Sequence, residues 1–191
     1  MKITASREDV LEILKMYKER VHVDFDSGQL KLDSLPIIWA RAELQFNMYA
    51  EMENLIGEPA SAVIRRMAKP YGASFCKLLH QGFLKAGRTP TRNELFKDVC
   101  AENLAIGWGG IEIEEMPEEI TVRSKTGLPV GLEFALREIK SERSVDSYFL
   151  GYFEGFLSAL DNRTYHGTEV SCKAKGDNEC VMVFKKAPGG R

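Results

Sequence analysis

The sequence predicts an α+β fold in which an antiparallel sheet packs against a layer of helices. Two observations support this class. Apolar residues at helical spacing dominate the first part of the chain, and paired runs of alternating residues appear later. Helices that come first and strands that pair afterwards argue against a parallel, doubly wound sheet. At 191 residues the chain is long enough for one domain with a substantial core, without disulfides or metal as its main support.

The first part of the chain is predicted to hold two helices separated by a hairpin. Residues 6–9 read Ser-Arg-Glu-Asp, which has the form of a capping box, so a helix is expected to begin there. Residues 22–32 alternate around an Asp-Ser-Gly turn and predict the hairpin. Pro36 suits the first turn of the next helix, and Gly57 suits its end.

The later elements are predicted from helix-capping residues, from proline and glycine residues that interrupt helices, and from the periodicity of apolar residues. Residues 59–85 predict a long helix that Pro70 and Gly72 should kink or split. Thr91 opens a second capping box three residues before a glutamate. The remaining predictions are a helix over 91–105, strands at 111–113 and 118–125, helices over 129–141 and 144–160, and a closing hairpin of 168–174 with 179–185.

The helix predicted over residues 144–160 has small residues at every fourth position, namely Ser147, Gly151 and Gly155. Glycine costs up to about 1 kcal/mol per helix position relative to alanine, so this spacing predicts close packing against another backbone. Two interpretations remain open. The helix packs in the core or at a dimer interface, or part of its aromatic face lines an apolar ligand cavity. The candidate cavity residues are Trp108, Phe149, Tyr152 and Phe156.

Composition and charge exclude several classes of function. The formal net charge is −2, with no basic stripe of the kind that binds nucleic acid, so no direct nucleic-acid contact is expected. No run approaches the roughly 18 apolar residues of a membrane span, and the N-terminus has no apolar signal segment. These features place the protein in the cytoplasm. Cys76 and Cys100 fall in helical patterns and are expected to be buried hydrophobic residues.

Residues 169–180 contain a candidate metal site. A glutamate at Glu169 and thiols at Cys172 and Cys180 flank a Lys-Gly-Asp-Asn turn, in which Asp177 is interpreted as a turn residue. Thiolates with a carboxylate favour zinc over calcium or magnesium. Residues three apart on a regular strand face opposite sides, so joint ligation would need a bulge or an irregular strand end. Simple burial, a disulfide between the two cysteines, and a solvent-facing glutamate remain as alternatives.

Two motifs give the sequence a resemblance to a known family. Gly151-Tyr152-x-x-Gly155-Phe156, followed by the Glu-x-x-Cys and Gly-Asp-x-x-Cys pattern of 169–180, resembles the 4-vinyl reductase domain, a predicted hydrocarbon-binding or small-molecule-binding module. That family is similar in fold to subunits of the transport-protein-particle (TRAPP) complex. Residues 24–79 resemble the front half of sensor domains in regulators that respond to phenols and xylenes.

The resemblance implies a TRAPP-subunit-like fold, an apolar pocket and a structural zinc. In the aromatic sensors the zinc ligands are a glutamate, two cysteines of the motif and one further cysteine before the Gly-Tyr helix. In this chain the resemblance places three of these ligands at Glu169, Cys172 and Cys180. The fourth ligand position, a cysteine in the sensors, is Asp146 here. An aspartate can bind zinc. His166 competes with Asp146 for this role, and no histidine and tryptophan pair for a phenol hydroxyl can be placed.

The leading functional hypothesis is therefore a small-molecule-binding or sensor domain with a structural zinc. We expect residues 1–58 to form the front half with the dimer interface, residues 59–187 the ligand-binding part, and residues 188–191 a frayed tail. The partners expected are an apolar or aromatic small molecule and a second copy. An enzyme acting on a vinyl-bearing tetrapyrrole is an alternative, but no nucleotide-binding glycine motif supplies a hydride donor. An adaptor in an assembly is a second alternative.

Overall fold

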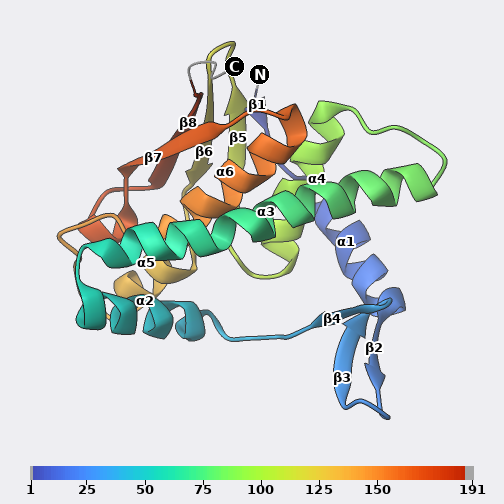
Figure 1. Cartoon of the computed structure of the whole chain (residues 1–191), viewed down its shortest axis with the longest axis horizontal. Coiled ribbons are helices and arrows are strands. Elements are labelled where there is room, and N and C mark those ends of the chain that lie inside the picture. Colours follow the sequence, from blue (N-terminus) through green and yellow to red (C-terminus); the bar gives the residue numbers. More distant parts are fainter. Residues whose placement is uncertain (1, 188–191) are drawn as a thin grey trace.

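A five-stranded sheet and the helices on one side of it form the body of the protein (Figure 1). The computed structural model describes residues 2–187. The predicted α+β class, an antiparallel sheet against a helical layer, is confirmed. Its elements are β1 (Lys2–Ile3), α1 (Arg7–Arg20), β2 (Val21–Asp24), β3 (Gln29–Leu32), β4 (Leu35–Ile37), α2 (Ala42–Ile56), α3 (Pro59–Lys85), α4 (Arg92–Ala105), β5 (Glu112–Glu115), β6 (Glu119–Ser124), α5 (Pro129–Leu136), α6 (Ser147–Asp161), β7 (Tyr165–Ser171), the 3-10 turn η1 (Lys173–Lys175) and β8 (Cys180–Lys186).

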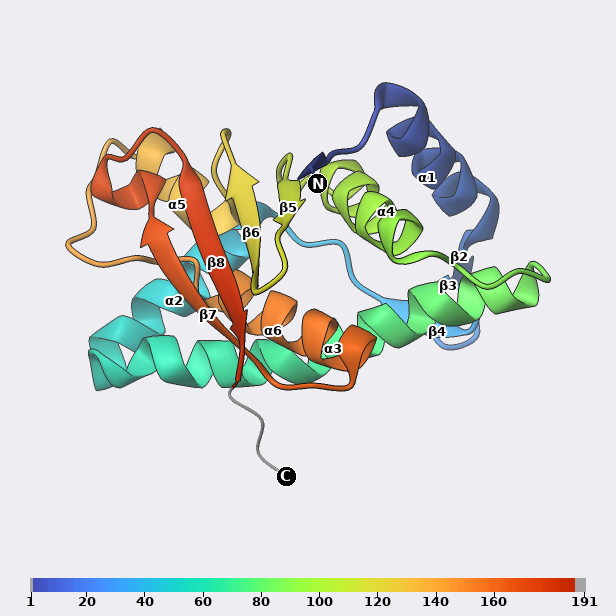
Figure 2. The same ribbon diagram turned by 90° about the horizontal axis from the view of Figure 1, so that it is seen from above.

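The main sheet has the strand order β1-β5-β6-β8-β7, and every neighbouring pair is antiparallel. Its covered face is apolar, because alternate side chains along each strand point the same way. Val122 on β6 and Met182 on β8 are paired and fully buried, and Phe184 reaches Phe153 of α6 with ring centroids 5.8 Å apart. Figure 2 shows the resulting layers, with α6 against the sheet and α3 outside α6.

Helices α3 and α6 approach each other at backbone distance. A Cβ added to Gly151 would lie 2.0 Å from the carbonyl oxygen of Arg65, and one added to Gly155 would lie 1.9 Å from that of Lys69. Real Cβ atoms do not tolerate such distances, so only glycine fits at either position. The four-residue glycine spacing therefore serves helix packing, which favours the core interpretation of this helix.

Two helix predictions need correction in their extent. Residues 59–85 form a single helix although Pro70 lies inside it, so the expected split is wrong. Gly72 is required there for packing, since a Cβ would lie 1.8 Å from the carbonyl oxygen of Tyr152. Pro70 has no backbone N–H to donate within α3. The close packing of α3 along α6 stabilises the helix at this point. The helix expected over 129–141 ends at Leu136, and Glu138 adopts a positive φ of 57° just beyond it.

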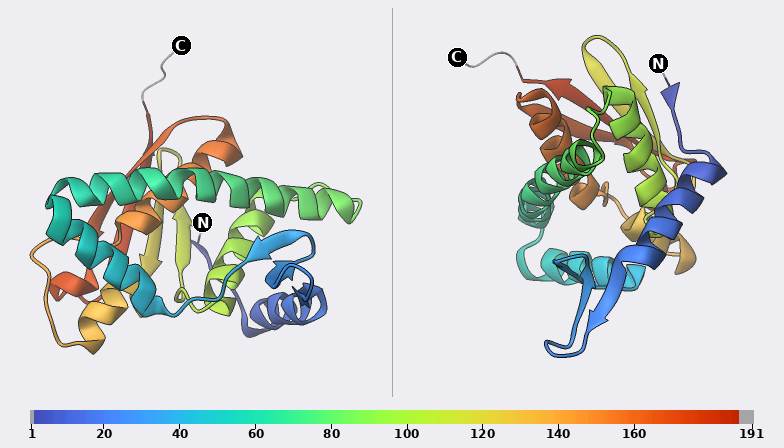
Figure 3. Two further views of the ribbon diagram at one scale, coloured as in Figure 1. Left: turned by 60° about the horizontal axis from the view of Figure 1, so that its bottom comes forward. Right: turned by 90° about the vertical axis from the view of Figure 1, so that its right-hand side faces the viewer.

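The segment between α1 and α2 forms a separate three-stranded sheet that projects from the body (Figure 3). The predicted hairpin of β2 and β3 is confirmed, and β4 adds a strand that the sequence did not predict. Pro36 lies in β4 opposite Lys31, so its assignment to a helix start is wrong, and α2 begins at Ala42 instead. Because β4 is an edge strand, it tolerates a proline that cannot donate to a neighbour.

Other local predictions are confirmed. Capping boxes open α1 and α4, with Ser6 and Thr91 as the N-cap residues. Cys76 and Cys100 are buried in helices. The described residues contain no helix long and apolar enough to cross a membrane. The expected frayed tail at 188–191 lies outside the described residues.

Candidate metal centre

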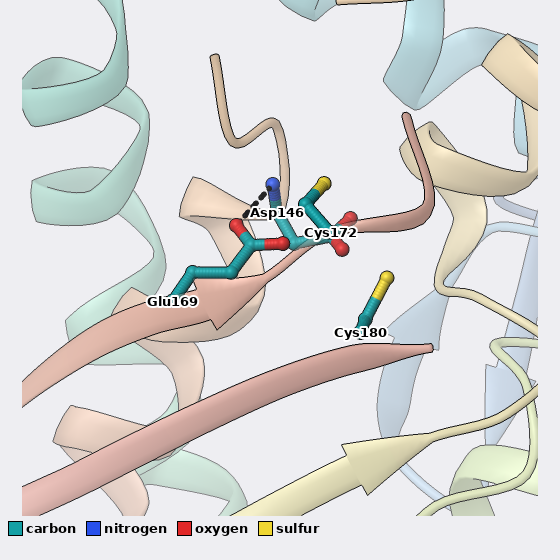
Figure 4. Close-up of side chains that lie close together, drawn as sticks. All are labelled: Asp146, Glu169, Cys172 and Cys180. Carbon is teal, nitrogen blue, oxygen red and sulfur yellow. Dashed lines mark hydrogen bonds between the residues drawn. The ribbon is translucent and has the colours of Figure 1, made fainter. Parts of the chain in front are cut away.

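Four side chains from three parts of the chain converge at one end of the main sheet (Figure 4). Asp146 directly precedes α6, Glu169 lies on β7, Cys172 follows β7, and Cys180 begins β8. One ligand atom from each, a carboxylate oxygen or a thiol sulfur, lies within 4.8 Å of all the others. The structure therefore brings together the set implied by the sequence resemblance.

Asp146 is the N-cap residue of α6, which places it at the start of that helix. It is 1% exposed. Its backbone N–H donates to Glu169 Oε2 at 3.1 Å, yet neither of its own carboxylate oxygens has a well-oriented hydrogen-bond donor among residues 2–187. A buried carboxylate without donors is energetically costly, and a cation at this position would offset that cost.

A β-bulge at Val170 turns Glu169 and Cys172 toward the same point. Glu169 pairs with Met182 on β8, and the next pair along β7 skips one residue, so β7 has an extra residue at this position. A bulge of this kind reverses which side the following residues face. The irregular strand end that joint ligation requires is therefore present.

The turn between the two cysteines is tied to both of them. Gly176 ends η1 with a φ of 100°, which favours glycine. Asp177 accepts a hydrogen bond from the Cys172 backbone N–H at 2.8 Å, and the Lys173 N–H donates to Cys180 Sγ at 3.4 Å. Asp177 thus stabilises the turn, as the sequence indicated, and lies outside the ligand cluster.

The electrostatics of the cluster suit a divalent cation. Within residues 2–187 no ion pair involves any of the four side chains. Burial raises the pKa of Asp146, and burial followed by the charge of Asp146 raises the pKa of Glu169. A hydrogen bond between the thiols lowers the pKa of Cys172 and raises that of Cys180. A bound metal ion would reverse these upward shifts by favouring the deprotonated ligands.

Two thiolates and two carboxylates are a donor set that zinc accepts in a closed tetrahedral site. Zinc–sulfur bonds of about 2.3 Å and zinc–oxygen bonds of about 2.0–2.2 Å place ligand atoms roughly 3.3–3.8 Å apart across a tetrahedron. A contraction of at most about 1.5 Å would bring the four atoms to these distances. The residues therefore fit a structural zinc.

His166, the competing fourth ligand, lies on β7 with an exposed side chain. The cluster of potential ligands in residues 2–187 contains Asp146 and not His166.

The four candidate ligand-binding residues belong to one aromatic cluster. Trp108 lies in the glycine-rich turn after α4, with its ring centroid 5.4 Å from that of Phe149 and 5.9 Å from that of Tyr152. Phe156 joins through Phe75 of α3, at 6.4 Å. The three α6 residues are buried and Trp108 is partly exposed. Their role in holding a ligand stays a prediction.

The sequence analysis missed two members of this cluster. The Tyr71 and Tyr148 rings lie 6.1 Å and 5.8 Å from Trp108, and both tyrosines reach the surface. The sequence analysis assigned no role to Tyr71. Its spacing of four residues from Phe75 would have placed both on one helix face.

A groove of about 640 Å³ adjoins the metal centre, between the first turns of α3 and α6 and strand β7. Arg65, Arg143 and Ser147 contribute polar side chains to it, and Glu169 lines both the groove and the ligand cluster. The four predicted ligand-binding aromatics do not line it. The sequence contained no indication of this groove, because its walls come from three separate segments.

Comparison with solved structures shows the fold. The chain is similar to the phenol-responsive sensory domain of the transcription activator PoxR in complex with phenol, with a TM-score of 0.72 and 16% identity over 93% of this chain and 90% of that one. A TRAPP complex subunit 3 from Naegleria fowleri, covalently bound to palmitic acid, has a TM-score of 0.54 and 11% identity over 78% and 95%. A vinyl-4-reductase family protein from Methanocaldococcus jannaschii has a TM-score of 0.47 and 15% identity over 65% and 68%.

No family model and no curated protein sequence matches the chain. At these identities the similarity defines a class of fold: the α+β domain found in the sensory domain of PoxR and in a TRAPP subunit. The fold expected from the resemblance is therefore confirmed.

Proposed function

We propose that the protein is a small-molecule-binding sensor domain whose C-terminal hairpin is fixed by a structural zinc. The observation that supports this most is the convergence of Asp146, Glu169, Cys172 and Cys180, buried or partly buried, around unpartnered carboxylate oxygens. Four protein ligands leave no open coordination position, so the metal would serve structure and not catalysis.

Zinc would be held by residues from both the helical layer and the sheet. Asp146 would attach the start of α6, while Glu169 and Cys172 would attach β7 and Cys180 would attach β8. When bound, the ion supplies positive charge that stabilises four ligands in their anionic forms. The thiols must stay reduced for this role, which agrees with the cytoplasmic location expected from the sequence.

The ligand would be an apolar or aromatic small molecule held near the aromatic cluster. Aromatic side chains with a few polar groups are the usual lining of such sites. Trp108, Phe149, Tyr152 and Phe156 remain the proposed contacts, and Tyr71 provides a partly exposed ring beside them. The similarity to a domain solved with phenol agrees with an aromatic ligand.

A homodimer is part of the proposal. Residues 1–58 would form the interface and the front half of the sensor, and residues 59–187 would hold the ligand and the metal. The division falls where α3 begins, at Pro59.

Metal analysis tests the first part of the proposal. Native mass spectrometry of protein purified without added zinc is expected to show about one zinc per chain. Cys180→Ala and Asp146→Asn are expected to lose it. Cys76→Ala removes a buried thiol that lies outside the cluster and is expected to keep it. Correctly folded wild-type protein without metal would contradict the proposal.

The same spectra test the ligand. A retained apolar molecule that is displaced by added phenols or alkylbenzenes is expected, with weaker retention in Tyr152→Ala. A bound tetrapyrrole, or turnover of a nicotinamide cofactor, would favour the enzyme alternative instead.

A further inference from the structure

The two cysteines of the candidate metal centre occupy opposite positions at the end of a hairpin. Strands β7 and β8 pair antiparallel, and the last pair beyond the bulge is Ser171 with Val181. One residue further along each strand are Cys172 and Cys180, so the same register places them directly across from each other. Both side chains extend to the side of the hairpin on which the candidate ligands converge (Figure 4).

This placement suits a covalent bond between the two sulfurs. Residues directly opposite each other in an antiparallel pair have Cβ atoms about 4.5–5.5 Å apart, and a disulfide joins Cβ atoms about 3.5–4.5 Å apart. The ligand atoms of Cys172 and Cys180 lie within 4.8 Å of each other, and both cysteines are free thiols. A small inward shift of the two side chains therefore converts the thiols into a disulfide.

The end of the hairpin is also closed by hydrogen bonds that involve neither sulfur. The Ser171 hydroxyl donates to the backbone carbonyl oxygen of Glu179 at 2.6 Å. The Lys173 ammonium donates to the backbone carbonyl oxygen of Asn178 at 3.0 Å. Because these bonds join the two sides of the turn directly, the hairpin stays closed when its thiols are oxidised.

Asp146 is the one member of the cluster that comes from outside the hairpin. Its backbone N–H donates to Glu169 Oε2 at 3.1 Å, but its buried carboxylate has no well-oriented donor among residues 2–187. A buried carboxylate without a donor or a cation costs free energy that contact with water would recover. The start of α6 therefore depends on a shared cation more than the hairpin does.

The segment that covers the two sulfurs is short and open to solvent. Residues 175–178 are all exposed, whereas Cys172 and Cys180 are fully buried beneath them. Exposed turns with few buried contacts open locally at a low free energy. A small reagent can therefore reach the sulfurs without unfolding the domain.

We propose that Cys172 and Cys180 are a redox modification site, at which a disulfide forms, the metal is released and the start of α6 is freed while the hairpin stays closed. This rests on the zinc centre proposed above and adds a way in which that centre is regulated. Disulfides in a reducing compartment are usually transient and serve redox sensing, which agrees with a bond that competes with a metal.

The oxidant is a small disulfide, for which oxidised glutathione is the probe. One cysteine thiolate attacks it, forms a mixed disulfide and releases one glutathione thiolate. The other cysteine thiolate then attacks the protein sulfur of the mixed disulfide and expels the second glutathione thiolate. The two cysteines lose two electrons and the small disulfide gains them. The zinc ion leaves as two glutathione thiolates appear, so the charges balance without a proton.

Native mass spectrometry of the full chain, purified with a reductant and then treated with oxidised glutathione, tests the covalent step. Each chain is expected to lose its zinc and the mass of two hydrogens and to carry no glutathione. Peptide mapping without reductant should locate the new bond between Cys172 and Cys180. Cys76→Ala, the matched control, should behave as wild type, because Cys76 is a buried thiol outside the cluster. Cys180→Ala should retain glutathione on Cys172, because no second thiol resolves the mixed disulfide.

Amide hydrogen exchange tests the structural consequence. Oxidation is expected to speed exchange in residues 144–150 about tenfold or more and to leave β7 and β8 unchanged. Removal of zinc by a chelator in the presence of reductant should speed exchange at the end of the hairpin as well, because no disulfide then replaces the metal.

The outcomes separate this proposal from the zinc centre itself. Zinc that stays bound in oxidised glutathione, or stable glutathione adducts without a bond between Cys172 and Cys180, would overturn the redox site and leave the zinc centre standing. An oxidised protein in which residues 144–150 exchange as slowly as before would overturn the release of α6. Correctly folded wild-type protein that contains no zinc would overturn both proposals.

Discussion

Helices α1 and α6 are similar in length, 14 and 15 residues, but they belong to regions with opposite packing. Ten residues of α6 are buried between the sheet and α3, whereas α1 buries none. Both have apolar residues at helical spacing. The difference shows that an amphipathic pattern indicates which face can be covered but not whether the same chain covers it. The body therefore has a core of its own, whereas residues 4–45 contain no buried residue.

The largest expected effect comes from the contact between α3 and α6. Gly155→Ala would place a Cβ 1.9 Å from the Lys69 carbonyl oxygen, which neither helix backbone can avoid without moving. We expect a loss of about 4 kcal/mol or more in the free energy of unfolding, measured by urea denaturation.

Gly82→Ala is the matched control, because Gly82 lies on α3 with no atom within 4 Å of an added Cβ. It should be neutral, or stabilise by up to about 1 kcal/mol through helix propensity. Equal effects of the two substitutions would contradict the assignment of the glycines to backbone packing.

A smaller effect is expected from the buried ion network of the body. Glu154 is buried on α6 and accepts hydrogen bonds from Arg65, Lys69 and the backbone N–H of Gly167. Burial alone would raise the pKa of Glu154, but these donors outweigh it and lower that pKa. Glu154→Gln should cost about 2–3 kcal/mol at neutral pH, because it leaves two partly exposed cations and the Gly167 N–H without a charged acceptor.

The matched control for Glu154 is an ion pair between the end of α1 and the turn that follows β3. Arg20 and Asp33 form a pair in which both side chains are about half exposed. Asp33→Asn should cost far less stability than Glu154→Gln, since water and salt screen an exposed pair. A comparable loss in both variants, measured by the same denaturation, would remove the energetic distinction between the two regions.

The smallest effect concerns α4, which joins the two regions. Burial raises the pKa of Asp98 to about 6, compared with about 3.9 in an unfolded chain. The folded state therefore holds this proton more tightly. The resulting stabilisation is complete below about pH 4 and disappears as the pH rises through 6.

Asp98→Asn removes that dependence. Compared with wild type, the variant should gain about 1 kcal/mol between pH 4 and pH 7.5, after allowance for partial exposure. Unfolding curves across this range measure the change. Parallel stability profiles for the two proteins would show that Asp98 does not titrate in this way.

Local sequence signals predicted much of the fold. Capping residues at Ser6 and Thr91 located two helix starts, and the glycine spacing in α6 predicted its backbone contact. Predictions from proline alone were less successful. Pro36 lies on an edge strand and Pro70 lies inside a continuous helix, because neighbouring elements compensate for the N–H that each proline lacks.

The residues of the candidate metal site were not all predicted from the same kind of evidence. Glu169, Cys172 and Cys180 could be proposed from a twelve-residue segment, together with the bulge that they would need. Asp146 came only from resemblance, since no local pattern distinguishes it from an ordinary helix-capping residue. The groove beside the centre and the contacts of Tyr71 with Trp108 and Tyr148 were not predicted, because they join segments distant in the sequence.

The sequence by itself determined the α+β class, the helix caps, the glycine contact surface and three of the four cluster residues. These depend on residues close together in the chain, whose spacing sets local geometry directly. Tertiary structure alone decided that Val170 forms the bulge, that Asp146 enters the cluster and that residues 4–45 stay uncovered. Each of these depends on how segments that are distant in the sequence pack together. That packing sets the burial of a side chain and the spacing of the candidate ligand atoms.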